Sequence, residues 1–139
     1  MFSFTRVTAL AAVAIALGST VNAQCARNYT VAPGDFCDGI SAAQHASTFQ
    51  LANANPTIDA ACDNLQADQV ICLGLLGKDC STTTVVEAGS GCDVITADAG
   101  IPISTLLHNN PNVAADCSNI YPGEASVSQH QEVRYESSH

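Results

Sequence analysis

The sequence has few positively charged residues. It contains 4 Lys and Arg against 13 Asp and Glu, which gives a formal net charge of −9. Because basic patches supply most of the affinity for nucleic acid, this balance argues against a nucleic-acid-binding protein. Tryptophan is absent, and aromatic residues make up 5% of the chain. With 139 residues, the chain has room for one modest domain or two very small ones.

The sequence also lacks an apolar run long enough to cross a membrane. Its main apolar stretch, Val7–Leu17, is shorter than the roughly 20 residues that a spanning helix needs. This stretch follows Arg6 and precedes the small residues of Val21–Ala23, an order typical of a secretory signal peptide. We therefore predict a signal peptide at residues 1–23, cleavage after Ala23, and a secreted, extracellular protein that does not associate with a membrane.

Cysteine is abundant, with 7 residues, yet no Cys-x-x-Cys pair occurs. All seven follow the predicted signal peptide, and disulfides are the default state in an oxidising compartment. We therefore expect disulfides, no metal site and no cofactor. An odd count means that one thiol stays unpaired if all the others pair. The seven are Cys25, Cys37, Cys62, Cys72, Cys80, Cys92 and Cys117.

The cysteine spacing repeats along the chain. A shift of 55 residues places Cys25 on Cys80, Cys37 on Cys92, and Cys62 on Cys117. Without any gap, the same shift aligns Asn55-Pro56 with Asn110-Pro111, which indicates two copies of one small unit. We place unit one at residues 25–73, a linker at 74–79, unit two at 80–127 and a disordered tail at 128–139.

Cys72 is the cysteine that the repeat leaves without a counterpart, because Val127 lies opposite it. Unit one has four cysteines, and the sequence cannot choose among their three pairings. Unit two has three, so one thiol there stays unpaired, and a disulfide-linked dimer remains open. We expect unit two to be less stable by one bridge, roughly 2–4 kcal/mol. The abrupt change after Glu124 also raises the hypothesis of a truncated or mispredicted reading frame.

Each unit has the pattern β-α-α-β, so the predicted fold class is α+β, with two small units stapled by disulfides and the second incomplete. β-branched and aromatic residues predict strands at 29–31 and 70–72, most simply paired antiparallel. One helix is predicted at 37–46, with Asp35 as its N-cap, and a second helix at 48–53. In unit two, the corresponding predictions are a strand at 83–86, helices at 92–99 and 103–108, and a weak last strand at 125–127.

Three segments of unit one resemble the lysin motif, LysM. Tyr29–Ile40 resembles its Tyr-Thr-Val-x-x-Gly-Asp opening, and Leu51–Pro56 its Leu-x-x-x-Asn-Pro helix end. Leu65–Ile71 is similar to its Leu-x-x-Gly-Gln-x-Leu close, with Asp68 at the glycine position. With its extra cysteines, the chain resembles secreted, cysteine-rich LysM proteins of fungi. The resemblance implies a β-α-α-β domain that binds chitin or other N-acetylglucosamine polymers without catalysis.

The resemblance places the sugar in a shallow groove between the loop after the first strand and the loop after the second helix. Backbone groups there would bond the acetamide and hydroxyls, and glycine lets a ligand approach the backbone closely. A neutral polysaccharide needs no charge match. The residues implied in unit one are Pro33, Gly34, Asp35, Phe36, Asn55, Pro56, Thr57 and Ile58. Those in unit two are Gly89, Ser90, Asn110, Pro111, Asn112 and Val113.

Unit two departs from the family pattern, because Thr84 replaces Tyr29 and Gly91 replaces Phe36. We therefore expect the stronger site in unit one. The alternative is a small disulfide-rich structural or inhibitor protein without sugar binding, and no nucleophile–base motif supports an enzyme. A ligand-induced dimer is also left open. Asn28 begins an N-glycosylation sequon, Asn28-Tyr29-Thr30, on the first strand.

Overall fold

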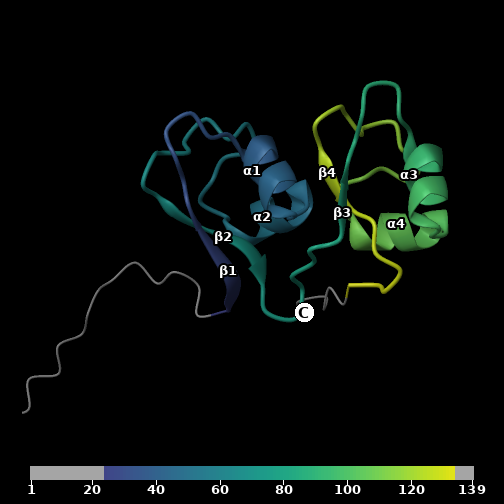
Figure 1. The fold of residues 1–139 in the computed structure, drawn as a ribbon, viewed down its shortest axis with the longest axis horizontal. Coiled ribbons are helices and arrows are strands. Elements are labelled where there is room, and N and C mark those ends of the chain that lie inside the picture. The colour runs from purple at the N-terminus through teal and green to yellow at the C-terminus, as the bar shows by residue number, and fades with distance from the viewer. Residues whose placement is uncertain (1–23, 134–139) are drawn as a thin grey trace, which may run out of the picture.

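The computed structural model describes residues 24–133. The predicted signal peptide at 1–23 and the end of the predicted tail, 134–139, lie outside the described residues. The chain forms two β-α-α-β units (Figure 1), which confirms the predicted α+β fold class. Unit one consists of β1 (Cys25–Thr30), α1 (Cys37–Gln44), α2 (Thr48–Ala54) and β2 (Val70–Leu75). Unit two consists of β3 (Thr83–Val85), α3 (Cys92–Ala99), α4 (Ile103–Asn109) and β4 (Ala125–Val127).

Each unit holds one two-stranded antiparallel sheet, and the two sheets share one register. Asn28 on β1 lies opposite Cys72 on β2, and Thr83 on β3, one repeat later, lies opposite Val127 on β4. The pairing of β1 with β2 is longer, because it continues to Cys25 opposite Leu75. The 55-residue repeat of the sequence is therefore also a repeat of strand pairing.

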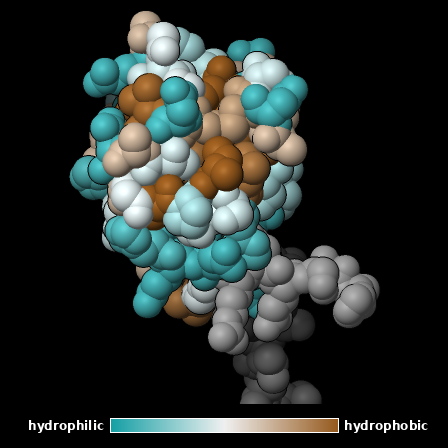
Figure 2. Space-filling model, turned by 90° about the vertical axis from the view of Figure 1, so that its right-hand side faces the viewer, coloured by the Kyte–Doolittle hydropathy of each residue, from teal (hydrophilic) through white to brown (hydrophobic). Residues whose placement is uncertain are grey.

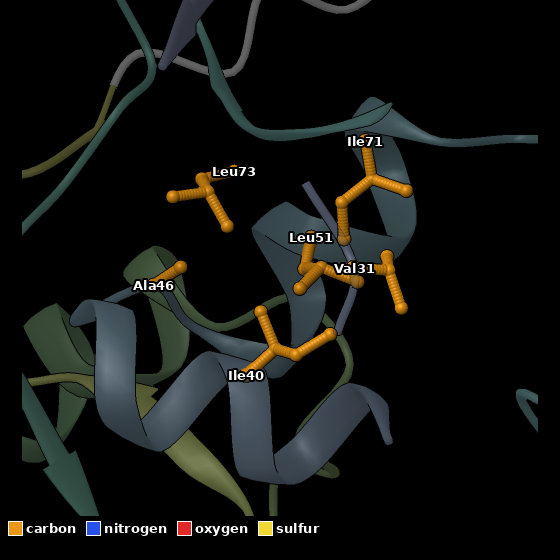
Figure 3. Close-up of a cluster of buried hydrophobic side chains, with 6 residues drawn as sticks. All are labelled: Val31, Ile40, Ala46, Leu51, Ile71 and Leu73. Carbon is orange, nitrogen blue, oxygen red and sulfur yellow. The ribbon is translucent and has the colours of Figure 1, made fainter. Parts of the chain in front are cut away.

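The core of unit one lies between its helices and its sheet (Figure 3). Its six buried side chains are Val31, Ile40, Ala46, Leu51, Ile71 and Leu73. Helices as short as α1 and α2 are not stable alone, so burial of this apolar face holds them in place. The Ser47 hydroxyl caps α2 by accepting a hydrogen bond from Gln50 N at 3.0 Å. α1 ends at His45 in the left-handed conformation, and α3 ends in the same way at its counterpart Gly100.

Unit two repeats most of this core, but not the part that comes from the last strand. Its buried apolar residues are Val86, Cys92, Ile95, Ile101, Leu106 and Val113. The positions of Ile71 and Leu73 are taken by Ser126 and Ser128, both buried. The Ser128 hydroxyl accepts a hydrogen bond from Thr84 Oγ1 at 2.9 Å. The sheet of unit two therefore buries less apolar surface than the sheet of unit one.

All seven cysteines lie in the described residues, and six of them form three disulfides. In unit one, Cys25–Cys72 joins β1 to β2, and Cys37–Cys62 joins the start of α1 to the loop before β2. Of the three pairings left open by the sequence, unit one therefore uses first with fourth and second with third. Unit two keeps Cys92–Cys117, the counterpart of the second bridge.

Cys80 is the free thiol of unit two. It is 5% exposed and packs with Val127 and Val133, so an apolar contact replaces the missing bridge. Burial raises the pKa of this thiol, which disfavours the reactive thiolate. Unit two is therefore incomplete in its disulfides although β4 is present, and the buried position of Cys80 does not favour a disulfide-linked dimer.

The prediction of a disordered tail from residue 128 is wrong for residues 128–133. The side chain of Asn109 accepts a hydrogen bond from Val133 N at 2.7 Å and donates to Gln131 O at 3.1 Å. Val133 itself is 4% exposed. The polar composition indicated disorder, but hydrogen bonds with Asn109, His108 and Thr82 hold backbone groups of this segment. The linker is also shorter than predicted, because β2 continues to Leu75.

The linker is held against unit one by hydrogen bonds and an ion pair. The Arg27 guanidinium donates two hydrogen bonds to the Asp79 carboxylate, at 2.6 and 2.7 Å, and one to Gln44 O at 2.8 Å. The Gln50 amide donates to Asp79 and exchanges hydrogen bonds with the backbone of Cys80. The first residues of unit two are thereby fixed against α1 and α2.

The two units dock directly, with β4 beside the two helices of unit one (Figure 1). Ala125 N donates a hydrogen bond to Thr48 Oγ1 at 3.0 Å, and Tyr121 OH donates to Asp38 Oδ1 at 3.2 Å.

The helices in residues 24–133 are all too short or too polar to cross a membrane.

Candidate functional site

The loop between β1 and α1 is shaped by Asp35. Its Oδ2 accepts hydrogen bonds from Tyr29 OH at 2.7 Å and from Ala32 N at 2.8 Å. The hydrogen bond to Asp35 raises the pKa of Tyr29. Gly34 has a φ of +86°, which a glycine adopts without strain. The N-cap of α1 is Phe36, so the prediction that Asp35 caps this helix is wrong: its carboxylate closes the preceding turn instead.

The loop after α2 is held by Asn55. Its amide nitrogen donates to Leu51 O at 2.7 Å and to Cys72 O at 2.6 Å, while its Oδ1 accepts from Cys72 N at 2.8 Å. The side chain thus clamps the end of α2 to β2. Asn55 was expected to touch sugar, but its amide is occupied by the fold, and replacing it would test stability rather than binding.

A pocket of about 290 Å³ opens between these two loops. The start of α1, the exposed side of α2 and residues 58–63 form its walls. Of the eight residues expected at the site in unit one, Phe36 and Ile58 line this pocket. The other six lie in the two loops outside its lining: Pro33, Gly34, Asp35, Asn55, Pro56 and Thr57. The structure therefore brings together one residue from each predicted loop.

Phe36 is the most exposed large hydrophobic side chain of the pocket lining, with 63% of its surface accessible. Its ring lies against Gly39 on the first turn of α1, where a Cβ atom would come within 2.9 Å of it. Ile58 is half-buried and packs on the core of unit one. The Cys37–Cys62 disulfide lines the pocket and ties its two sides together. A disulfide-braced pocket with both apolar and polar walls is of a kind that binds small ligands.

Tyr121 of unit two completes the pocket, and the sequence analysis missed it. Its hydroxyl donates to Asp38 Oδ1, which also accepts from Thr48 Oγ1 at 3.1 Å. Partial burial, together with the charge of Asp38 and the hydrogen bond to it, raises the pKa of Tyr121 to about 12. The phenol therefore stays neutral over the physiological range. The position of Tyr121 depends on how the two units dock, and no local motif carries that signal.

Unit two has a pocket at the same place in its repeat. It is lined by the start of α3, Ile103 and residues 115–117, and it is more open, with a volume of about 550 Å³. Gly91 stands where unit one has Phe36, and Ile103 where it has Thr48. Figure 2 shows the side of the molecule formed by α3 and α4, where hydrophobic side chains form separate patches among polar ones. Val94 and Ile103 are exposed there, at 41% and 46%.

The site residues expected in unit two lie outside the lining of that pocket: Gly89, Ser90, Asn110, Pro111, Asn112 and Val113. Asn110 is 1% exposed and repeats the Asn55 clamp, with hydrogen bonds to Leu106 O and to both backbone groups of Val127. Val113 belongs to the core, and the Asn112 amide donates to the Glu124 carboxylate. These side chains serve the fold of unit two.

Other kinds of site find less support in the described residues. Within residues 24–133, no group of three or more His, Cys, Asp or Glu side chains is placed to hold a metal ion. Asn28, the predicted glycosylation site, is exposed on β1, as attachment of a glycan requires. Glycosylation at Asn28 stays a prediction.

The comparisons with known proteins agree with the β-α-α-β geometry. Residues 29–74 match the LysM domain family. The chain is 31% identical over 122 residues to the secreted LysM effector LysM1 of Trichophyton rubrum, covering 71% of this chain and 48% of that one. It is 26% identical over 129 residues to the secreted LysM effector Blys8 of Beauveria bassiana, covering 70% and 32%. The non-secreted LysM effector LysM15 of Penicillium expansum is 30% identical over 92 residues, covering 66% and 6%.

The chain thus spans about half the length, or less, of these curated relatives. Among solved structures, it resembles the spore cortex-lytic enzyme SleL of Bacillus megaterium at 20% identity, covering 75% of this chain and 22% of that one with a TM-score of 0.37. Residues 29–74 of this chain thus match the LysM domain, and about 70% of the chain is homologous to fungal LysM effectors.

Proposed function

We propose that this protein is a secreted, non-catalytic binder of chitin or other N-acetylglucosamine oligomers, with its site in the pocket of unit one. The observation that carries the proposal is the meeting of Phe36 and Ile58, one from each predicted loop, in a single pocket of a LysM domain. In a fungus, such binding would shield the cell wall or sequester chitin fragments from a host.

The chemistry of the pocket supports a neutral sugar polymer. Phe36 and Ile58 offer apolar surface to the C–H face of a pyranose ring, and Thr48 and the aspartates of the lining offer polar atoms to its hydroxyls and acetamide. The protein carries a net charge of −9, which would repel an anionic polymer but not an uncharged one.

The carboxylates around the pocket support binding rather than hydrolysis. Glycoside hydrolysis needs two carboxyl groups that flank the scissile bond in a cleft. Asp38 is engaged by Tyr121 and Thr48, and the Asp59 carboxylate accepts a hydrogen bond from Asp63 N at 2.8 Å within its own loop. Asp63, the third aspartate of the lining, then leaves a single carboxylate where hydrolysis needs a pair, which supports a binding site.

Calorimetric titration of the purified protein with soluble chitin oligomers tests the proposal, with cellulose oligomers of equal length as the control that lacks the acetamide. We expect heat and saturation with chitin oligomers alone. The absence of heat, together with the absence of retention on chitin beads, would overturn the proposal in favour of a disulfide-rich protein without a sugar ligand.

Phe36→Ala locates the site. We expect affinity for chitin oligomers to fall about tenfold, because truncating a central aromatic contact typically costs more than about 1 kcal/mol. The matched control is Leu76→Ala, since Leu76 is 62% exposed, close to the 63% of Phe36, but lies outside the pocket. Equal affinity of the two variants would place the site elsewhere.

A further inference from the structure

The pocket of unit one is built from both units. All of its walls except one come from residues 36–63, and the remaining wall is Tyr121, which lies 83 residues from its partner Asp38. In Figure 1, the end of unit two runs beside the helices of unit one, as the hydrogen bonds between them require. An isolated first unit would therefore have a different and more open pocket.

The Tyr121 ring is fixed before any ligand arrives. Its hydroxyl is bonded to Asp38, and its backbone nitrogen donates to Glu124 Oε2 at 3.3 Å. Thr48 bonds to Asp38 and also accepts from Ala125 N, so one hydroxyl links the helix of unit one to β4. A side chain that is already ordered loses little conformational freedom on binding, which favours affinity.

The ring is nevertheless available to a ligand. Tyr121 is 42% exposed although its hydroxyl is hydrogen-bonded to Asp38, and it lines the pocket. Tyrosine combines a rigid apolar face with an anchored polar end, a property that makes it frequent at binding surfaces. The C–H face of a pyranose is a suitable partner for such a ring.

The corresponding pocket of unit two has no such wall in its lining. All of its lining residues belong to unit two itself. The counterpart of Tyr121 is Gln66, which lies in unit one and is absent from the lining of both pockets. The docking of the units thus completes one of the two pockets and leaves the other open.

We propose that unit two acts as a wall of the first unit's sugar site, with Tyr121 stacking on a sugar ring opposite Phe36 and Ile58. This inference rests on the proposed function, since it adds a contact to the same pocket. It gives unit two a role even though its own pocket lacks an aromatic wall. Thr48 and Asp38 are positioning residues that hold the ring through its hydroxyl and through β4.

The test compares three variants by calorimetry with soluble chitin oligomers. Tyr121→Ala removes the ring and should weaken binding at least about fivefold, whereas Tyr121→Phe keeps the ring and should bind within about twofold of the wild type. Val85→Ala is the control for an exposed apolar truncation in unit two, because Val85 is 38% exposed and outside this pocket. Thermal unfolding of each variant checks that the fold is kept.

The outcomes separate this inference from the proposed function. If the wild type gives no heat, the proposed function fails. If the wild type binds and Phe36→Ala weakens binding while Tyr121→Ala does not, the proposed function stands and the role of Tyr121 is refuted. Equal losses in Tyr121→Ala and Tyr121→Phe would also refute it, because the hydroxyl rather than the ring would then matter.

Tyrosine fluorescence gives a second readout that does not depend on the stability of Tyr121→Ala. The chain has no Trp and 3 Tyr, so its emission comes from tyrosine. Stacking of a sugar on the Tyr121 ring should change the emission of the wild type on addition of chitin oligomers. The same change in Tyr121→Phe would overturn the inference, and its loss would support it.

Discussion

The two units share one β-α-α-β fold but are stabilised differently. Both pair their strands in the same register, and both clamp the second helix to the last strand with an asparagine, Asn55 in one and Asn110 in the other. Unit one adds a disulfide between its strands, whereas unit two fills the same place with Val127 against the free Cys80. The comparison indicates that hydrogen bonds and apolar burial define the fold, and that the strand-to-strand disulfide adds stability to it.

The largest expected effect comes from restoring the missing bridge. In Val127→Cys, the introduced thiol would lie in the register position of Cys72 and at the same 47-residue separation from Cys80 as in the Cys25–Cys72 bridge. A disulfide should form and raise the free energy of unfolding by about 4 kcal/mol, as loop-closure entropy gives for such a loop. Urea unfolding and thiol titration under non-reducing conditions measure both effects.

The reverse change gives unit one the composition of unit two. Cys72→Val, which leaves Cys25 as a free thiol like its counterpart Cys80, should lower the free energy of unfolding by a similar amount without changing the secondary structure. If Val127→Cys kept both thiols free and its stability unchanged, the structural equivalence of the two strand pairs would be contradicted.

The next largest effect concerns the asparagine clamps. Asn110→Ala should cost about 2–3 kcal/mol, because it removes the side-chain partner of both buried backbone groups of Val127 on β4. Asn55→Ala should cost less, about 1–2 kcal/mol, since Asn55 is partly exposed and the disulfide at Cys72 still holds β2. Asn53→Ala, an exposed position on α2, is the matched control and should change stability little.

Thermal unfolding of the three asparagine variants measures these differences. A smaller loss in Asn110→Ala than in Asn55→Ala would contradict the view that unit two depends more on its clamp because it lacks the second bridge.

The smallest expected effect is a dependence on pH through Glu124. Its side chain is 1% exposed, and burial raises the pKa of its carboxyl above the usual 4.5, although the hydrogen bond from Asn112 acts in the opposite direction. A raised pKa in the folded state means that the contribution of this group to stability is present below about pH 4.5. That contribution is lost as the pH rises through the folded-state pKa.

Unit one shows how to remove this dependence, because the counterpart of Glu124 is Gln69. Gln69 Oε1 accepts from Gln66 N at 3.1 Å, as Glu124 Oε2 accepts from Tyr121 N. Glu124→Gln should therefore stabilise the protein at pH 7 by less than about 1 kcal/mol and leave stability near pH 4 unchanged. A loss of stability at pH 7 would show that the charge itself is needed there.

Much of the fold could be predicted because the repeat and the hydrophobic pattern agree. The helix at 92–99 was predicted to the residue, and α1, predicted at 37–46, ends two residues earlier at Gln44. The segment at 128–133 was missed because its order depends on Asn109, a distant side chain that composition does not reveal.

The candidate site was predicted in part, and its errors have physical causes. Phe36 and Ile58, which the resemblance places in the two loops, line the pocket, and their contact with sugar stays a prediction. Asn55 was assigned to sugar although the persistence of Asn110 in the diverged unit two already pointed to a structural role. Tyr121 could not be found, since its position at the pocket depends on how two separately folded units dock.

The central claim is that the chain has one sugar site, in unit one, completed by Tyr121 of unit two. Heteronuclear NMR of the labelled protein, titrated with a soluble chitin oligomer, tests it most directly. We predict shifts of the signals of Phe36, Ile58 and Tyr121, with the signals of Gly91 and Ile103 in unit two unchanged. Shifts centred on Gly91 and Ile103, or on Phe36 and Ile58 without Tyr121, would contradict the claim.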